Sequence, residues 1–319
     1  MIARALWHIA PGKAELRPCA EPSGERIVTA ICSGISRGTE RLVHHGRVPA
    51  SQHEAMRGPM QEGDFPFPVK YGYAVVGRDQ HGARVFCLHP HQERFGIPAA
   101  LCAPIPDGVP DRRAVLAANM ETALNILWDA APLPGERALV IGAGVVGLLT
   151  AFLLSRIPGM AVTVTDRDPA RRAIAESLGA GFAMPGDAPA GQELIVHATA
   201  SEAGLRLALE RAAFEARIIE ASWFGDREPA LPLGAAFHQR RLRLLSTQVG
   251  SVAPGMRGRR SHGQRMALAL SLLEDARLDA LLGPTILFDE LPARIGAVLD
   301  PPPGAPQPLC PVVTYGDAA

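Results

Sequence analysis

The sequence predicts an α/β protein that combines a barrel-like β module with a doubly wound parallel sheet. Three observations predict this fold class. The chain has 319 residues, which is long for one hydrophobic core and sufficient for two domains. Residues 1–110 contain short apolar segments broken by turn residues, and strand-like and helix-like segments alternate after them. Strands that alternate with helices favour a parallel sheet with helices on both faces.

The first part of the chain is expected to be all-β. Alternating β-branched residues indicate a strand at Glu25–Ile31, and segments rich in Val, Tyr and Phe indicate strands at Val69–Gly77 and Ala83–Leu88. Between the first two strands, Arg47–Pro68 is rich in proline and glycine, so we expect a long ordered loop there. Short strands at this spacing are typical of a barrel-like module.

The second part begins with a helical pattern at Arg113–Ala130 and then alternates. We expect strands at Ala138–Ile141, Ala161–Thr165, Leu194–Ala198, Ala216–Ala221 and Leu242–Thr247, with helices at Val145–Ser155, Pro169–Leu178 and Ala203–Arg211. In the tail, Ser261–Asp300 predicts a helix, a strand near Thr285–Phe288 and a second helix. The segment Pro301–Pro308 is too rich in proline for a helix or a strand. The last segment, Cys310–Tyr315, predicts a closing strand.

Composition limits the classes of function. The 32 basic and 32 acidic residues give a formal net charge of zero, which argues against nucleic acid as a partner. One basic run, Arg257–Arg265, reads either as a solvated loop and helix start or as a site for an anionic group. The five cysteines form no CxxC pair. We find no signal peptide and no membrane-length apolar stretch, so we expect a cytoplasmic protein that does not bind membranes.

A glycine motif follows the apolar strand Ala138–Ile141. Gly142, Gly144 and Gly147 form a GxGxxG pattern that opens an apolar helix. The first glycine permits the tight turn, the second lets the backbone approach a pyrophosphate, and the third lets helix and strand pack closely. The N–H groups of Val145 and Val146 at the helix start would then face the phosphates. The full strand–turn–helix context predicts a dinucleotide site.

An acidic residue ends the next strand. Asp166 stands nineteen residues beyond Gly147, where a carboxylate accepts hydrogen bonds from the adenosine ribose and repels a 2′-phosphate. Asp166 therefore favours NAD, although Arg167, Arg171 and Arg172 leave NADP possible. Because ligands bind at the carboxyl ends of such strands, three further turns should contribute to the cofactor site through Thr199, Ala200, Ser222 and Gln248.

Several short motifs, in this order and spacing, resemble the medium-chain dehydrogenase/reductase superfamily. They are Gly34–Glu40, Pro68–Tyr73, Gly82–Val85, Ile105–Gly108, Thr122–Leu124 and Leu178–Ala180. The resemblance covers nearly the whole chain. It implies a GroES-like β-barrel catalytic domain at residues 1–121 and 254–319, a Rossmann domain at 122–253, and a homodimer.

The departures from the superfamily pattern concern zinc. Where zinc-dependent members place three ligands, this chain has Ser36 or Arg37, then Tyr73, then Ala118. No cysteine lies between Cys87 and Cys102, so the four cysteines of the structural zinc site are missing as well. Catalytic zinc takes nitrogen, thiolate or carboxylate ligands. We therefore predict an enzyme without metal.

The segments Ser33–Pro49 and Ser246–Val252 look most like a zinc-less branch that includes the bacteriochlorophyllide a dehydrogenase. This similarity implies interconversion of a secondary alcohol and a ketone by hydride transfer. Without a metal, side-chain donors must stabilise the developing alkoxide. Tyr73 is the first candidate, with its pKa lowered by a cation such as Lys70, and Thr39 takes the position of the proton-relay hydroxyl.

Weaker catalytic candidates and two other classes of function stay open. Glu121 follows the lost ligand position on a helix, His44 and His45 could shuttle protons from an exposed turn, and Arg37 could hold a substrate carboxylate. The chain could instead be a nicotinamide-binding sensor or scaffold whose catalysis has decayed. A third possibility keeps a metal on displaced ligands from His44, His89, His91 and Cys87.

Overall fold

The computed structural model describes residues 2–302, 304–305 and 307–316. The chain forms two compact units: Met1–Ala118 with Met266–Ala319 is unit 1, and Asn119–Arg265 is unit 2. The domain boundaries expected from the sequence, 121/122 and 253/254, lie close to the first of these divisions and twelve residues before the second. Among the described helices, none is long and apolar enough to cross a bilayer.

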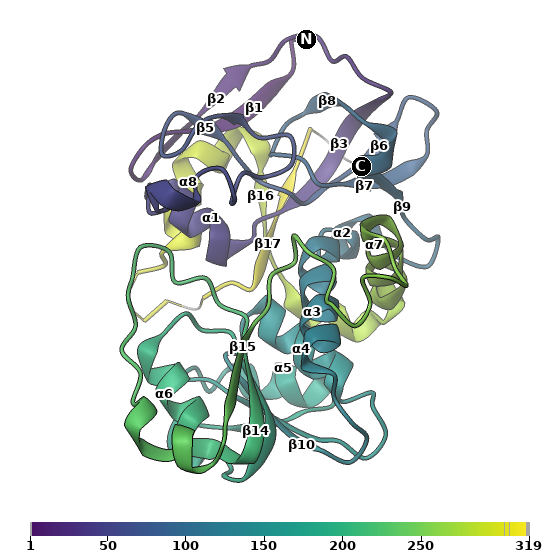
Figure 1. Ribbon diagram of the computed structural model, residues 1–319. Helices are drawn as coiled ribbons and strands as arrows, with labels where there is room; N and C mark the ends of the chain where they lie inside the picture. The colour runs from purple at the N-terminus through teal and green to yellow at the C-terminus, as the bar shows by residue number, and fades with distance from the viewer. Residues whose placement is uncertain (1, 303, 306, 317–319) are drawn as a thin grey trace. The chain divides into compact units, whose positions relative to one another are not determined.

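Unit 1 is built on two mainly antiparallel sheets (Figure 1). The larger sheet has the order β16-β17-β3-β6-β7-β9, with β8 paired to β3. Its strands are β3 (Arg26–Gly34), β6 (Val75–Asp79), β7 (Arg84–Cys87), β8 (Arg94–Ile97), β9 (Cys102–Pro104), β16 (Leu282–Leu287) and β17 (Cys310–Thr314). The smaller sheet, β2-β1-β5-β4, contains β1 (Arg4–Ala10), β2 (Lys13–Pro18), β4 (Glu62–Gly63) and β5 (Val69–Lys70). These sheets confirm the predicted β module.

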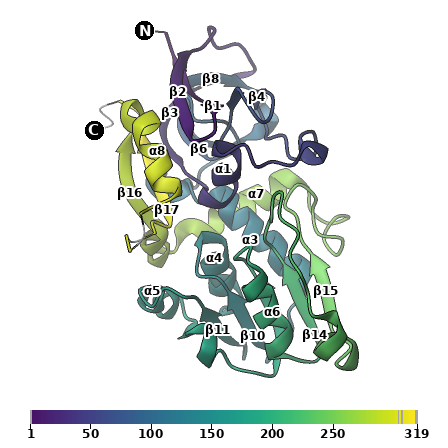
Figure 2. The ribbon, with the colours of Figure 1, turned by 90° about the vertical axis from the view of Figure 1, so that its left-hand side faces the viewer.

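The helices of unit 1 are short. They are α1 (Arg37–His44), α2 (Asp111–Ala114) and α8 (Leu291–Leu299), and α8 lies beside β16 (Figure 2). One core joins the unit, because Val28, Val75 and Phe95 of the strands pack with Ile295 of α8 and Tyr315 of the C-terminal segment. The C-terminal strand thus completes a sheet begun by the N-terminal part of the chain.

Unit 2 is a six-stranded parallel sheet in the order β12-β11-β10-β13-β14-β15. Its strands are β10 (Arg137–Ile141), β11 (Ala161–Thr165), β12 (Gly181–Ala183), β13 (Gln192–His197), β14 (Ala212–Glu220) and β15 (Arg243–Ser246), and its main helices are α3 (Ala117–Ala130, shared with the end of unit 1), α4 (Val145–Leu154), α5 (Arg171–Ser177) and α6 (Glu202–Arg211). Helix α7 (His262–Ser271) begins in this unit and continues into unit 1. This strand order is that of doubly wound dinucleotide-binding sheets, so the predicted Rossmann sheet is confirmed.

Three predicted elements need correction. The strand expected at Val69–Gly77 is broken into β5 and β6, because Gly72 has φ +130° and turns the chain between them. The helix expected at Arg113–Ala130 is divided into α2 and α3. The long loop Arg47–Pro68 also contains a one-turn 3₁₀ helix, Ala50–Gln52, and the short strand β4.

Candidate active site

The turn between β10 and α4 requires glycine at two positions for internal reasons. Gly142 has φ +112°, and a Cβ there would lie 2.7 Å from Cγ2 of Thr199. A Cβ on Gly147 would lie only 1.9 Å from the carbonyl oxygen of Gly142, so helix and strand could not pack as closely. Both positions therefore serve the local fold, as the sequence predicted.

Gly144 is different, because a Cβ there would meet no protein atom within 4 Å. Its φ of −76° is also accessible to any residue. Neither packing nor backbone conformation within the chain therefore requires glycine at this exposed position. The first N–H groups of an α-helix have no partner within the helix, and those of Val145 and Val146 open α4. The loop thus fits the diphosphate of a dinucleotide.

Asp166 follows β11 and is fixed by two backbone N–H groups. Its Oδ2 accepts a hydrogen bond from Ala143 at 2.7 Å, and its Oδ1 accepts one from Asp168 at 2.9 Å. Arg171 forms an ion pair with Asp168 at 3.2 Å. Arg167 is exposed. The carboxylate predicted to read the ribose therefore stands against the glycine loop.

Arg172, which follows Arg171 on α5, is used within the protein. Its guanidinium donates to the carbonyl of Phe182 at 3.1 Å and stacks on the Phe182 ring.

The turns after β13, β14 and β15 carry the other predicted cofactor residues. The Ala200 N–H donates to Oγ of Ser222 at 2.9 Å, and Ala200 has φ +47°. Oε1 of Gln248 accepts a hydrogen bond from the N–H of Gly250 at 2.6 Å. Thr199 is exposed, with Oγ1 2.6 Å from Nε2 of His197. These contacts shape the carboxyl edge of the sheet, where ligands of such folds bind.

Sequence reasoning missed His197 at this edge. The side chain is fully buried at the end of β13, and its Nδ1 lies 2.7 Å from Oε2 of Glu220 at the end of β14. The imidazole therefore links Glu220 to Thr199. A histidine that interrupts the apolar run of β13 just before the predicted turn was the available signal.

Glu121 is a buried, ion-paired residue rather than a lone acid. It is buried, and its Oε1 accepts a hydrogen bond from Nε of Arg265 at 3.0 Å. Arg265 is also buried, and its guanidinium donates to Asn125 at 2.6 Å and to the carbonyl of Val249 at 2.6 Å. Burial raises the pKa of Glu121, while the charge of Arg265 lowers it. This pair ties α3 to the loop after β15, and the buried Arg265 is not part of a solvated run. The catalytic role of Glu121 stays a prediction.

Unit 1 brings Tyr73 and Thr39 together. Tyr73 is half-buried as a residue, and its hydroxyl is hydrogen-bonded to the side chains of Ser36 and Thr39. Burial raises the pKa of Tyr73 to about 12, and the two hydroxyl partners lower it by less. Tyr73, Ser36 and Thr39 are called the hydroxyl cluster below.

The predicted lowering of the Tyr73 pKa by Lys70 is wrong. The ammonium of Lys70 is buried and is used elsewhere, where it donates to Oε1 of Gln92 at 2.7 Å and pairs with Glu62. The phenol of Tyr73 therefore keeps its proton at neutral pH and can donate a hydrogen bond.

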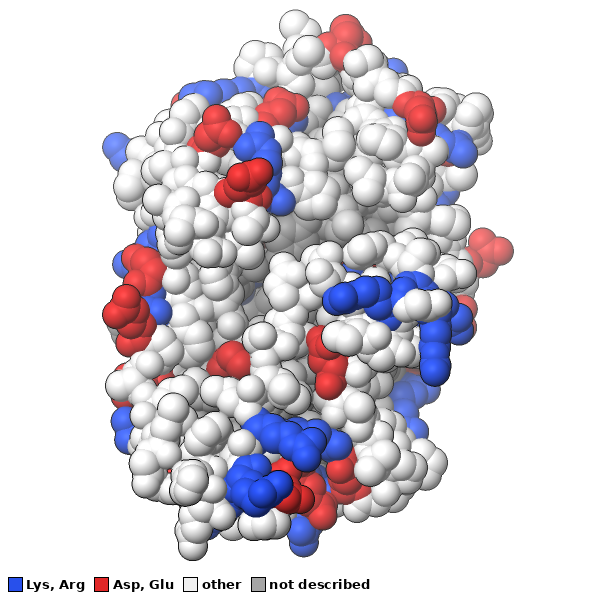
Figure 3. Space-filling view, viewed as in Figure 1, with Lys and Arg blue, Asp and Glu red and all other residues white. Residues whose placement is uncertain are grey.

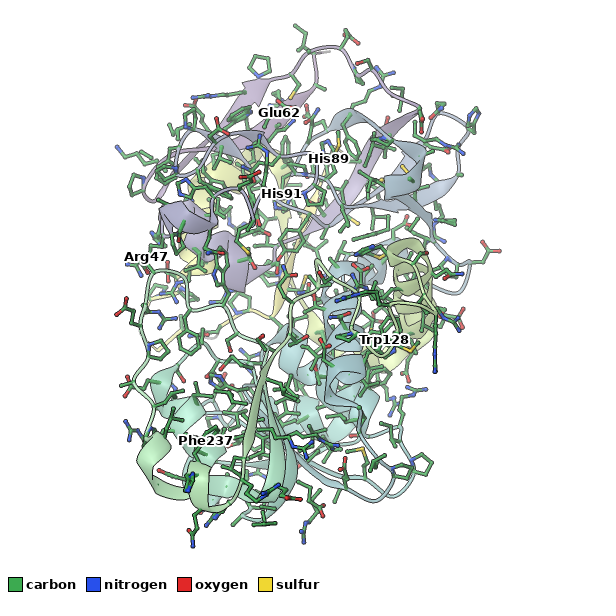
Figure 4. The ribbon with its side chains drawn as sticks, viewed as in Figure 1. Arg47, Glu62, His89, His91, Trp128 and Phe237 are labelled. Carbon is green, nitrogen blue, oxygen red and sulfur yellow. The ribbon has the colours of Figure 1, made fainter. Side chains whose placement is uncertain are left out.

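A buried polar chain lies behind the hydroxyl cluster. Glu40 accepts a hydrogen bond from the backbone N–H of Ser36 at 2.7 Å, and its other oxygen lies 3.0 Å from Nε2 of His91. Nδ1 of His91 lies 2.8 Å from Oγ of Ser33, which lies 2.9 Å from the hydroxyl of Tyr315. His91 and His89 come from the segment after β7 and lie inside unit 1 (Figure 4). The sequence did not predict this chain of contacts.

The other candidates in unit 1 have internal partners. His44 is buried instead of exposed, with its Nδ1 3.0 Å from Nδ1 of His8. His45 pairs with Asp300 at 2.5 Å. Arg37 donates to three backbone carbonyls, those of Val298, Leu299 and Pro308. The contacts of His44 and His45 therefore give no support to a proton shuttle, and those of Arg37 give none to a site for a substrate carboxylate.

The three positions that the resembled superfamily uses for zinc ligands carry side chains of another kind. Ser36, Tyr73 and Ala118 supply two hydroxyls and a methyl group at the three expected ligand positions, and these are not the ligands that zinc takes in proteins. No described group of three or more His, Cys, Asp or Glu side chains could hold a metal ion. His89, one of the residues suggested as a displaced metal ligand, stacks on Phe95 with ring centroids 3.6 Å apart. The ring is thus packed against an aromatic neighbour.

Charge on the surface is mixed. On the face drawn in Figure 3, uncharged residues cover most of the area, and acidic and basic side chains lie in scattered groups, in keeping with a formal net charge of zero. The face offers no broad basic field of the kind that attracts a polyanion.

Comparisons with known proteins agree with this architecture. No protein-family model matches the chain. An L-threonine 3-dehydrogenase of Mesorhizobium japonicum is 36% identical over 87 residues, which are 27% of this chain and 25% of that protein. The chain thus matches only about a quarter of the length of this curated relative.

Two solved structures match almost the whole chain. A candidate zinc-binding dehydrogenase of Sinorhizobium meliloti 1021, solved with NADP, has a TM-score of 0.78 at 17% identity, over 98% of this chain and 99% of that one. An Escherichia coli CFT073 protein described as a short chain alcohol dehydrogenase, solved with NADH, has a TM-score of 0.77 at 18% identity over the same shares. The chain therefore has the fold of these dehydrogenases.

Proposed function

We propose that this chain is a nicotinamide-dependent oxidoreductase that interconverts a secondary alcohol and a ketone without zinc. The observation that carries the proposal is Gly144, whose missing Cβ serves no contact within the protein and leaves the backbone open to a diphosphate. The neighbouring Asp166 and the match to dehydrogenases that bind NADP or NADH support the same proposal.

NAD is the preferred cofactor in this proposal. Asp166 presents a carboxylate against the glycine loop, where it would repel the 2′-phosphate of NADP. Of the three nearby arginines, Arg171 forms an ion pair with Asp168 and Arg172 forms one with Glu176 at 3.6 Å. These ion pairs offset part of the positive charge that a 2′-phosphate would meet.

The hydroxyl cluster provides the acid–base chemistry. A bound nicotinamide supplies the hydride. Tyr73 keeps its proton because burial raises its pKa to about 12, so it donates a hydrogen bond to the substrate oxygen and stabilises the alkoxide. Thr39 and Ser36 contact the same phenol, and each hydroxyl can accept one proton and donate another. We therefore assign Tyr73 as the donor and Thr39 as the relay to solvent.

The proposal includes catalysis without zinc. Ser36, Tyr73 and Ala118 at the three ligand positions support this point. Elemental analysis of the purified protein tests it directly, since stoichiometric zinc would overturn it. Similarity to the zinc-less branch, the homodimer and the cytoplasmic location stay predictions from the sequence.

The decisive experiment has two stages. Fluorescence titration with NADH and NADPH tests binding, and oxidation of NADH with a panel of ketones, with and without chelator, tests turnover. Tyr73→Phe should lower kcat at least about 10²-fold, the typical contribution of a positioned proton donor, and leave NADH affinity unchanged. Tyr71→Phe is the matched control, because Tyr71 is a buried neighbour whose ring contacts Tyr73.

A cofactor-binding sensor remains the second candidate, favoured by the methyl group of Ala118 at a ligand position. Tight NADH binding without turnover on a broad ketone and alcohol panel would support it over the enzyme.

A further inference from the structure

We propose that Cys87 and Cys102 form an oxidant-responsive thiol pair, which peroxide or a low-molecular-weight disulfide converts to a disulfide between β7 and β9. This proposal does not depend on the proposed function. It rests on the pairing of the two strands, on the contact of the two sulfurs and on the difference in their exposure.

The backbone brings the two cysteines directly opposite each other. β7 and β9 are antiparallel, with Val85 opposite Pro104 and Cys87 opposite Cys102. The N–H of Ile105 donates to the carbonyl of Arg84 at 3.1 Å, so the pair that follows, Val85 with Pro104, is of the non-hydrogen-bonded kind. Proline, which has no N–H, fits that position.

Because the two kinds of pair alternate along an antiparallel ladder, Cys87 and Cys102 also form a non-hydrogen-bonded pair. Directly opposed residues of this kind have Cα atoms about 4.5 Å apart, which lies within the range of about 4.4–6.8 Å that a disulfide spans. A disulfide can therefore form here without moving the strands apart or changing their register.

The side chains already face each other. The two Sγ atoms are 3.6 Å apart and share a hydrogen bond. Cys87 is fully buried, whereas Cys102 is half-buried and reachable from solvent. The hydrogen bond from the Cys87 thiol lowers the pKa of Cys102, and the same bond raises the pKa of Cys87. Cys102 is thus the nucleophile and Cys87 the resolving thiol.

The reaction with peroxide balances in two steps. The Cys102 thiolate attacks one peroxide oxygen, the O–O bond breaks, and a sulfenic acid forms. The departing hydroxide takes up the proton that the Cys102 thiol released and leaves as water. The sulfur of Cys87 then attacks Cys102, the S–O bond breaks, and the hydroxyl leaves as a second water with the Cys87 proton. Each cysteine gives up one electron, and the peroxide is reduced to two waters.

The remaining cysteines have different partners. The thiols of Cys19, Cys32 and Cys310 contact backbone carbonyls, those of Arg17, Asp111 and Pro311. Cys19 is half-buried like Cys102, but burial raises its pKa. Cys19 is therefore the matched control, because its thiol is similarly exposed but its pKa is not lowered.

The disulfide would fix an edge of unit 1. β9 is the terminal strand of the larger sheet, and Cys87 is the last residue of β7, immediately before the segment that carries His89 and His91. Crosslinking these strands would slow hydrogen exchange at the edge and raise the melting temperature of the oxidised protein. Reduction would reverse both changes.

The test uses the full chain treated with a small excess of hydrogen peroxide. Thiol titration in denaturant should fall from five to three, because the chain has five cysteines, and peptide mapping should find Cys87 linked to Cys102. Dithiothreitol should restore all five thiols. Retention of five thiols, or a linkage between other cysteines, would overturn the proposal. Because the peptide mapping uses the wild-type chain, this result does not depend on whether a variant folds.

Variants assign the two roles. Cys87→Ser should stop the reaction at a sulfenic acid on Cys102 that a dimedone probe labels, whereas Cys102→Ser should lose the labelling and keep four thiols. Cys19→Ser should behave like the wild type and lose two thiols. Dimedone labelling of Cys19 in place of Cys102 would contradict the assignment of the nucleophile.

Discussion

The carboxylate of Asp166 accepts a hydrogen bond of 2.7 Å from the backbone N–H of Ala143, twenty-three residues earlier in the chain. This bond connects the end of β11 to the glycine turn after β10, so the residue proposed to read the ribose also shapes the diphosphate loop. A substitution of Asp166 therefore changes two properties at once: the charge near the ribose and the support of the loop.

Asp166→Asn separates these two properties. The amide oxygen can still accept from Ala143, although the bond from the Asp168 N–H is lost. Because the negative charge is removed, we expect the NADH/NADPH preference to narrow about tenfold, the effect of roughly 1.4 kcal/mol of lost repulsion. Asp166→Ser should narrow the preference too and weaken binding of both nucleotides, because the shorter side chain leaves the Ala143 N–H without its partner. Fluorescence titration gives the dissociation constants of NADH and NADPH for each variant. A ratio of these constants that is unchanged in both variants would show that Asp166 does not read the ribose.

Two alanine substitutions in the glycine motif should have opposite consequences. Gly144→Ala places its Cβ in open space, so the melting temperature should change little while nucleotide affinity falls at least about tenfold. Gly147→Ala drives its Cβ to 1.9 Å from the carbonyl oxygen of Gly142, so we expect a loss of about 1–3 kcal/mol in unfolding free energy, typical of overpacking. Urea unfolding without cofactor measures the stability of both variants, and NADH titration measures their nucleotide affinity. Equal destabilisation by the two variants would remove the main argument for the diphosphate loop.

The ion pair of Glu121 and Arg265 should act on stability and not on the chemical step. Removing one partner of a buried pair leaves an uncompensated charge, which typically costs about 3–5 kcal/mol, so Glu121→Ala should lower the unfolding midpoint strongly. The double variant Glu121→Ala with Arg265→Met should recover part of that loss, because no buried charge remains. A double-mutant cycle measures the coupling. A fall in kcat with an unchanged midpoint in Glu121→Gln would instead restore the catalytic interpretation.

The parts of the fold and site that the sequence predicted depend on local patterns. The strand–turn–helix unit around Gly142 and Gly147 could be recognised because its geometry is set by a few adjacent residues. The position of Asp166 followed from the length of one β-α-β unit. The strand break at Gly72 was missed, because its positive φ is not visible in an otherwise strand-like composition.

Partners far apart in the sequence could not be predicted in this way. Glu121 and Arg265 are separated by 144 residues, and neither carries a pattern that points to the other. Lys70 was expected beside Tyr73 because the two are close in sequence, but the turn at Gly72 sends Lys70 to Glu62 and Gln92. The contact of Tyr73 with Thr39 was within reach of prediction only because both positions belong to motifs of the resembled superfamily.

Burial of neutral histidines should make the protein lose stability in mild acid. Burial lowers the pKa of His8 to about 3, and it lowers the pKa of His89 to about 3 as well. In the unfolded chain the histidine pKa is about 6.5, so above that value both states are neutral and these groups contribute no pH dependence. As the pH falls from about 6.5 towards 3, the unfolded state binds protons that the folded state refuses. Each histidine then costs about 1.4 kcal/mol of stability per pH unit.

Urea unfolding between pH 7 and pH 5 checks this prediction, because exposed carboxylates stay largely ionised over that range. His8→Asn should reduce the slope of the unfolding free energy against pH in part, since His89 and His44, whose pKa burial also lowers, still contribute. His81→Asn is the matched control, because His81 is exposed and its removal should leave the slope unchanged. A wild-type unfolding free energy that stays level from pH 6.5 to pH 5 would mean that His8 and His89 accept protons in the folded state, and the packing around both rings would then have to admit a charge.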